Sequence, residues 1–143
     1  MGKYRKPAEL RGWDFSQVKV VEEGPRIGYS KVVKCHLERS KTLLDIGTGG
    51  GERLLAFAPK VREAIAIDID REMIKTAVEN LGKSGLHNVD LILCDSEEMP
   101  IVGARIDIVT DRQAPFNAKE VSRILKPGGA FITQQVSEGD KRN

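Results

Sequence analysis

The stretch Leu43-Leu44-Asp45-Ile46-Gly47-Thr48-Gly49-Gly50-Gly51-Glu52 decides the fold of this chain. An apolar segment ends in an acid and leads into glycines at alternate positions, and residues 53–58 then predict a helix. A strand, a glycine-rich turn and a helix in this order are typical of the opening of a nucleotide-binding α/β fold. Glycine is needed where the backbone takes a positive φ or lies directly against a ligand. The stretch therefore predicts a bound cofactor.

Strands and helices alternate along the rest of the chain, which predicts a mostly parallel sheet between layers of helices. The expected strands are apolar on both faces, as a sheet covered on both sides requires. Asp70 is expected to cap the helix that follows it, and Gly82 or Gly85 to end that helix. Residues 1–27 are rich in prolines and glycines and are expected to be irregular. The expected helices are 29–40, 52–58, 71–81 and 117–125, and the expected strands are 42–46, 64–69, 89–94, 106–110 and 130–136.

Length and composition indicate one soluble globular domain. The chain has 143 residues, of which 40% are hydrophobic and 31% charged. No apolar run approaches the roughly 20 residues that a membrane helix needs, and no secretory signal is visible. The two cysteines, Cys35 and Cys94, have no metal-ligand spacing, and Cys94 is expected to be a buried free thiol. We therefore expect a cytoplasmic protein with no membrane contact and no metal site.

The net charge of +2 is unevenly distributed. Residues 1–41 hold ten Lys and Arg against five Asp and Glu, whereas residues 42–143 hold thirteen against sixteen. A basic N-terminal segment beside a mildly acidic domain is compatible with an anionic partner such as RNA. An ordinary solvated surface explains the same charges, because no aromatic residues are interleaved for base stacking.

The glycine turn also discriminates between nucleotide classes. The dinucleotide fingerprint G-x-G-x-x-G requires glycine at its sixth position. Counted from Gly47, the sixth position of this sequence is Glu52. A glutamate at the start of the helix would repel a diphosphate, so NAD and FAD are disfavoured. A Walker P-loop is excluded, since no Gly-Lys-Ser/Thr follows the glycines.

At four separate places the sequence resembles the class I S-adenosylmethionine-dependent methyltransferases, over roughly residues 41–136. The four motifs stand in the family's order, each at the end of an expected strand or in the turn that leads into one, so together they are far more specific than one glycine motif. They are Asp45-Ile46-Gly47-Thr48-Gly49-Gly50-Gly51, Ala66-Ile67-Asp68-Ile69-Asp70-Arg71-Glu72-Met73, Cys94-Asp95-Ser96-Glu97-Glu98-Met99-Pro100 and Leu125-Lys126-Pro127-Gly128-Gly129-Ala130-Phe131.

The resemblance implies that the first motif binds the methionine and ribose parts of S-adenosylmethionine. Asp45 would hold the glycine loop and favour the cationic amino group and sulfonium, although an Asp that only forms the turn is the alternative. The loop positions Gly47, Thr48, Gly49 and Gly51 would pass against the cofactor.

The other implied cofactor ligands follow the next two strands. Asp68, at the end of its strand, would accept hydrogen bonds from two ribose hydroxyls, and Ile69 would pack on the adenine face. Asp95 would accept the adenine amino hydrogen, and the Ser96 amide would donate to a ring nitrogen.

The methyl acceptor is not specified by the sequence. The strand at 106–110 leads into Asp111, Arg112 and Gln113, which are candidates for the acceptor side or for the methionine carboxylate, and we count Asp111 among the cofactor-binding residues. Surface residues at a helix entry would explain these three equally well. The sequence here matches neither Asn/Asp-Pro-Pro-Tyr/Phe nor Pro-Cys, the motifs expected of enzymes that methylate base amines or cytosine C5, and no general base can be named.

The two ends of the chain carry two further expectations. Residues 1–28, which include the single Trp13, are expected to form a basic lid over the cofactor, with simple docking onto the domain as the alternative. Residues 29–143 would form the cofactor domain. The family continues after its fifth strand with a helix and an antiparallel hairpin, and this sequence stops soon after its fifth expected strand. We therefore expect a fragment of a longer protein, with a short family member or a chain completed by a partner as the alternatives. Phe131, Ile132 and Val136 would then lie on an exposed sheet edge, through which the chain is expected to self-associate.

The sequence thus predicts a three-layer α/β sandwich with a mostly parallel sheet in the order 3-2-1-4-5, as the resemblance implies. The expected function is methyl transfer from S-adenosylmethionine to an unidentified small molecule, protein or RNA. A non-catalytic S-adenosylmethionine-binding module, or half of a complex, is the first alternative. An NAD-dependent oxidoreductase is the second.

Overall fold

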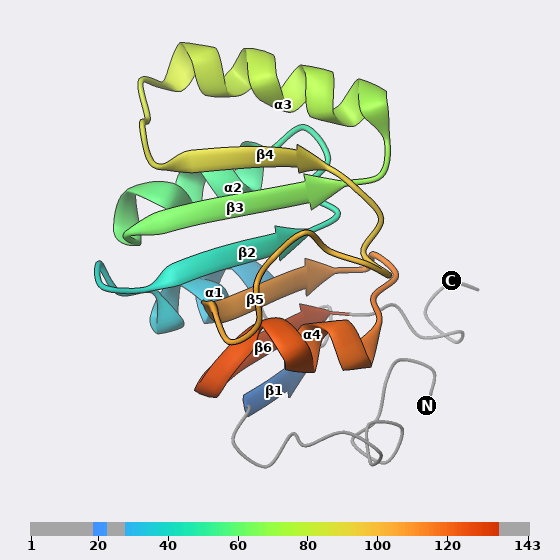
Figure 1. Cartoon of the computed structure of the whole chain (residues 1–143). Coiled ribbons are helices and arrows are strands. Elements are labelled where there is room, and N and C mark those ends of the chain that lie inside the picture. Colours follow the sequence, from blue (N-terminus) through green and yellow to red (C-terminus); the bar gives the residue numbers. More distant parts are fainter. Residues whose placement is uncertain (1–18, 23–27, 135–143) are drawn as a thin grey trace, which may run out of the picture.

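A central sheet of six parallel strands organises the chain in the computed structural model, which describes residues 19–22 and 28–134. The strand order is β1-β6-β5-β2-β3-β4. Figure 1 shows α4 on one face of the sheet and α1 and α2 on the other. The strands are β1 Lys19–Glu22, β2 Thr42–Ile46, β3 Glu63–Asp68, β4 Val89–Leu93, β5 Ile106–Arg112 and β6 Leu125–Gln134. The helices are α1 Tyr29–His36, α2 Glu52–Phe57, α3 Arg71–Ser84 and α4 Ala118–Ile124, with a 3-10 turn η2 at Ala58–Lys60.

The five strands β4, β3, β2, β5 and β6 confirm the predicted order 3-2-1-4-5. Every described strand pair is parallel, and each crossover carries helix or loop over one face of the sheet. The core accordingly lies in two halves. One half packs α4 and the loop around Met99 against the sheet, and the other packs α1 and α2 against the opposite face.

The sixth strand corrects two expectations about the ends of the chain. Residues 1–27 were expected to be irregular, but Lys19–Glu22 forms β1, which pairs with β6 from Ala130 to Thr133. Phe131 and Ile132 therefore do not lie on a free sheet edge, and the expected self-association through that edge loses its physical reason. Val136 and the Trp13 segment lie outside the described residues.

Helix ends are set by local chemistry. The Asp70 carboxylate accepts hydrogen bonds from the backbone amides of Glu72 and Met73, at 2.8 and 3.4 Å, which confirms the predicted cap of α3. Gly85, with φ +76°, ends α3 in the left-handed conformation that glycine adopts without strain. The helix runs through Gly82, because a glycine inside a helix weakens it without breaking it.

Candidate functional site

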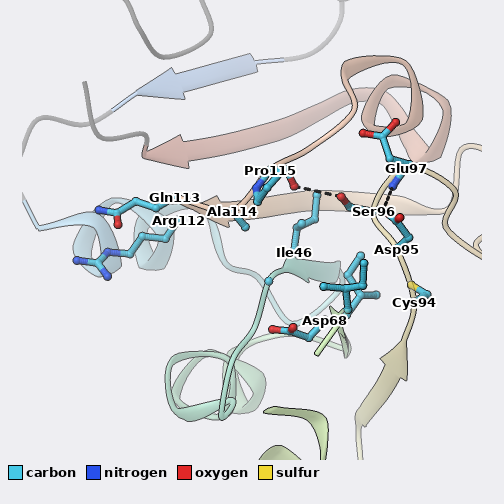
Figure 2. A pocket seen from close by; sticks show the side chains of 13 residues that line it. Ile46, Asp68, Cys94, Asp95, Ser96, Glu97, Arg112, Gln113, Ala114 and Pro115 are labelled. Atoms are coloured by element: carbon cyan, nitrogen blue, oxygen red, sulfur yellow. Dashed lines mark hydrogen bonds between the residues drawn. The ribbon is translucent and has the colours of Figure 1, made fainter. Parts of the chain in front are cut away.

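A pocket of about 510 Å³ opens at the carboxyl ends of the strands, where β2 and β5 lie side by side. The helix after β2 packs on one face of the sheet and the helix after β5 on the other, so the strand order reverses here. In open α/β sheets this crevice is where ligands bind. Figure 2 shows the lining residues, which come from the ends of β2, β3 and β5 and from the loops that follow β2, β3, β4 and β5. They are Ile46, Gly47, Ile67, Asp68, Ile69, Cys94, Asp95, Ser96, Glu97, Arg112, Gln113, Ala114 and Pro115.

The glycine loop after β2 is shaped by backbone conformations that other residues rarely adopt. Gly47, Gly49 and Gly51 have φ of +69°, +61° and +83°. A Cβ on Gly47 would lie 2.5 Å from the Cβ of Ala114, far inside van der Waals contact. The loop can therefore fold tightly against the residues after β5 only because the side chain is absent.

Asp68, at the end of β3, ties the glycine loop to the start of α3. One carboxylate oxygen accepts from the Gly49 amide at 2.8 Å, and the other accepts from the Asp70 amide at 2.9 Å. Each carboxylate oxygen can accept a second hydrogen bond, so the side chain is positioned by the backbone and can still bind a ligand.

Ile69, next to Asp68, is an apolar residue turned into solvent. Its exposed fraction is 69%, although it lines the pocket beside Asp68. Met73, one turn into α3, is also partly exposed, and its sulfur approaches Gly49. The Ile69 and Met73 side chains form an apolar surface beside the Asp68 carboxylate, and a flat ring could pack on this surface.

Asp95 and Ser96 form the opposite wall of the pocket, after β4. The Asp95 carboxylate accepts from the Glu97 amide at 2.9 Å, which closes a turn and orients the carboxylate. The Ser96 hydroxyl donates to the Pro115 carbonyl at 3.1 Å, and this bond joins the loop after β4 to the loop after β5 (Figure 2). Cys94 was expected to be buried, but it is only half-buried and lines the pocket.

Two buried acids, Asp45 and Asp111, lie behind the glycine loop at the ends of β2 and β5. Asp45 accepts a 2.7 Å hydrogen bond from the hydroxyl of Thr110, its partner in the β2–β5 pairing. Asp111 is fully buried; one oxygen accepts from the Ala114 amide, and the other has no partner among the described residues.

The surroundings of these acids favour their neutral forms. Burial raises the pKa of Asp45 to about 6, with Thr110 opposing the shift by its hydrogen bond. Burial also raises the pKa of Asp111 to about 8; the Ala114 amide opposes this shift and the nearby Asp45 charge adds to it. A cation placed between the two acids would reverse both shifts, because an opposite charge stabilises the carboxylate.

Tyr29, the first residue of α1, is a site residue that sequence reasoning missed. Its ring is 5% exposed, and its hydroxyl lies beside Thr110 without a well-formed hydrogen bond to any described residue. Burial and the charges of Asp45 and Asp111 raise its pKa above the ordinary value. The Arg53 guanidinium lies 5.9 Å from the centre of the ring. The spacing of apolar residues predicts the helix that begins at Tyr29, but this spacing gives no sign of the acids around the Tyr29 side chain.

The predicted site residues are brought to one end of the sheet. Gly47, Asp68, Ile69, Asp95 and Ser96 line the pocket itself. Asp45, Thr48, Gly49, Gly51 and Asp111 belong to the loop and strand ends directly behind its wall. Within residues 19–22 and 28–134, no group of three or more His, Cys, Asp or Glu side chains could hold a metal ion. In the same part of the chain, none of the helices has the length and apolar character needed to cross a membrane.

The fold and the site define a methyltransferase domain. A family model described as a methyltransferase domain matches residues 37–142, and the chain therefore belongs to this family. The curated relatives include the uncharacterized methyltransferase YcgJ of Bacillus subtilis, 33% identical over 137 residues that cover 90% of this chain and 52% of YcgJ. They also include a malonyl-[acyl-carrier protein] O-methyltransferase of a Marinomonas species, 30% identical over 72% of this chain and 41% of that protein.

Solved structures agree with this assignment. The crystal structure of the same Bacillus YcgJ superposes with a TM-score of 0.68 at 31% identity, and the match covers 73% of this chain and 49% of that one. The chain thus spans about half the length of the relatives that it matches.

Proposed function

We propose that this chain binds S-adenosylmethionine in the pocket at the carboxyl ends of β2, β3, β4 and β5 and transfers its methyl group to an acceptor. The observation that carries the proposal is the Asp68 carboxylate. Two backbone amides fix this carboxylate, which lies between the glycine loop and the exposed Ile69. Family membership supports the same cofactor.

The adenosine half fits the wall formed by the ends of β3 and β4. Asp68 would accept the two ribose hydroxyls, and Ile69 would cover one face of the adenine. Asp95 would accept from the adenine amino group, and the Ser96 amide would donate to a ring nitrogen. Burying an Ile69 side chain that is now exposed would stabilise the complex by about 1.5–3 kcal/mol.

The methionine half fits the glycine loop and the buried acids. Its ammonium group would lie toward Asp111, whose second oxygen has no partner in the described structure, with Asp45 and the Tyr29 hydroxyl close by. Two acids and a phenol in a buried space form a site for a cation. A neutral ligand would leave these buried acids without an opposite charge.

The bound cofactor supplies a methyl group that is already activated on a cationic sulfur. The chain's residues therefore have to hold the cofactor, exclude water and align the acceptor. Arg112 at the end of β5 and Gln113 after it lie across the pocket from Asp95 (Figure 2), and this is the side from which we propose that the acceptor enters.

We also propose that residues 1–28 form a lid segment and residues 29–143 the cofactor domain, and that the protein is cytoplasmic. Within the first segment, β1 anchors the chain to β6. Trp13 is the only tryptophan, so its fluorescence reports on that segment alone. A lid predicts a fluorescence change on saturation with S-adenosylhomocysteine, and an unchanged spectrum would contradict it.

Calorimetric titration tests the cofactor. We expect micromolar binding of S-adenosylmethionine and S-adenosylhomocysteine and no binding of NAD, because Glu52 at the start of α2 would repel a diphosphate. The Asp68→Asn variant should bind S-adenosylhomocysteine at least about tenfold more weakly, since it loses charge-assisted bonds to the ribose. Asp90→Asn, an exposed substitution in β4 outside this pocket, is the matched control and should bind like the unchanged chain.

Three results separate the alternatives. NAD binding with no affinity for the sulfur cofactors would favour an oxidoreductase. Failure of a well-folded chain to bind any of them would contradict the proposed site. Binding without transfer of a labelled methyl group to any component of a cell extract would favour a non-catalytic module.

A further inference from the structure

Arg112 is the only cationic side chain among the thirteen described residues that line the pocket. The same lining contains three acids, Asp68, Asp95 and Glu97, of which Asp95 and Glu97 lie across the pocket from Arg112 (Figure 2). A single guanidinium at one end of an otherwise acidic pocket marks the place where an anionic group would bind.

The backbone and a neutral side chain hold this guanidinium in place. The Nε of Arg112 donates to the side-chain oxygen of Gln134 at 2.9 Å, and the Gln113 amide donates to the Gln134 carbonyl at 2.7 Å. Gln113 has φ +69°, a conformation that is strained for a non-glycine residue and persists only where the surroundings support it. The strained turn at Gln113 therefore fixes the position of Arg112 at the end of β5.

The terminal nitrogens of Arg112 have no carboxylate partner within residues 19–22 and 28–134. No Asp or Glu oxygen of the described residues lies within 4.0 Å of them, whereas Arg105 and Arg123 are paired with Glu63 and Glu120. Because Nε is already used, the two terminal nitrogens remain as parallel donors. Carboxylate and phosphate groups match this arrangement.

We propose that Arg112 binds a carboxylate or phosphate group of the methyl acceptor, so that the acceptor is an anionic molecule. This inference rests on the proposed function. Arg53 is a second cation available to the carboxylate of the cofactor itself, because it lies over the Tyr29 ring and acts on Asp45, beside the space proposed for the methionine ammonium. Arg112, an exposed residue at the end of β5, remains for the acceptor.

The test uses the full chain saturated with S-adenosylhomocysteine. Malonate, inorganic phosphate and the uncharged malonamide are titrated at constant ionic strength while amide NMR shifts are followed. We expect saturable binding of the two anions and none of malonamide. Arg112→Gln should weaken anion binding at least about fivefold, and Arg112→Lys should fall between, because a lysine cannot make the two parallel bonds. Arg39→Gln, an exposed arginine outside the pocket, should change nothing.

A second titration distinguishes the two possible sources of the anionic group. S-adenosylhomocysteine carries the amino-acid carboxylate and 5′-methylthioadenosine lacks it. We expect the affinities of the Arg112→Gln variant for both compounds to lie within about twofold of those of the unchanged chain. Such a change is smaller than the loss of an ion pair would cause. A tenfold loss for S-adenosylhomocysteine alone would assign Arg112 to the cofactor and overturn the proposal. Absence of saturable anion binding in the unchanged chain would also overturn it. Failure of S-adenosylhomocysteine itself to bind would contradict the proposed function and this inference together.

Discussion

At the scale of single residues, the site depends on acids in three different environments. Asp95 is exposed, Asp68 is held by two amides, and Asp111 is fully buried with one oxygen that no described residue contacts by a hydrogen bond. The same carboxyl group can therefore serve as a solvated acceptor, a fixed acceptor and a site for a cation. Which of these it becomes depends on the strand end where it lies.

The buried acid makes stability depend on pH. The pKa of Asp111 is about 8 in the folded chain against an ordinary 3.8, so between these pH values the folded state keeps a proton that the unfolded chain has lost. The free energy of unfolding must then fall as pH rises through this window, and the full contribution is present only below it. Asp45 adds to the effect with the same sign.

We expect Asp111→Asn to remove most of this dependence. Urea unfolding at about pH 5 and about pH 8 should show a smaller loss of stability for the variant, by on the order of 4 kcal/mol, since each of the roughly three pH units inside the window is worth about 1.4 kcal/mol. Parallel pH profiles for the variant and the unchanged chain would contradict the assignment. Asp90→Asn, exposed on β4, controls for the loss of a charge.

Gly47 offers a second test at this scale. Gly47→Ala should destabilise the chain by about 2 kcal/mol or more and weaken binding of S-adenosylhomocysteine, because the new Cβ meets Ala114 and the φ of +69° is strained. Gly82→Ala is the matched control, since nothing lies within 4 Å of a Cβ there. That change should leave binding intact and raise stability by up to about 1 kcal/mol. Equal effects of the two changes on thermal unfolding would show that the loop geometry is unimportant.

At the scale of elements, the alternation of strands and helices predicted the five strands, and the family resemblance implied their order. The resemblance also placed Asp45 and Asp68 in the site, at the ends of two of these strands. Tyr29 could not be assigned in this way, because its role depends on Thr110 and Asp111, more than eighty positions away. The element β1 was missed because four residues, Lys19–Glu22, show no periodicity and pair with a strand at the other end of the chain.

The cap of α3 permits a prediction for one element. Asp70→Ala should lower the free energy of unfolding by about 1 kcal/mol, because the Glu72 and Met73 amides lose their acceptor. Asp70→Asn keeps an acceptor oxygen and should cost much less. Urea denaturation would measure both changes, and an equal loss for Ala and Asn would assign the effect to charge instead of capping.

At the scale of the whole molecule, β1 closes the β6 edge of the sheet. Deleting residues 1–22 should uncover the backbone amides and carbonyls of β6 and produce concentration-dependent association. Sedimentation velocity over a hundredfold concentration range would measure it, with the undeleted chain as the control. If the shortened chain sediments as a monomer throughout, β1 does not protect the sheet.

The pairing of β1 with β6 also has a consequence for how the chain is made. Lys19 lies beside Ala130, so the first described strand to leave the ribosome has to wait until β6 has been synthesised before its partner exists. Contacts between such distant positions form late in folding, because the entropy cost of closing a long loop comes before the strand pairing contributes any stabilising free energy. The nascent chain therefore carries an unpaired strand until β6 has left the ribosome, and this is the interval in which a chaperone or a misplaced neighbour would compete for it.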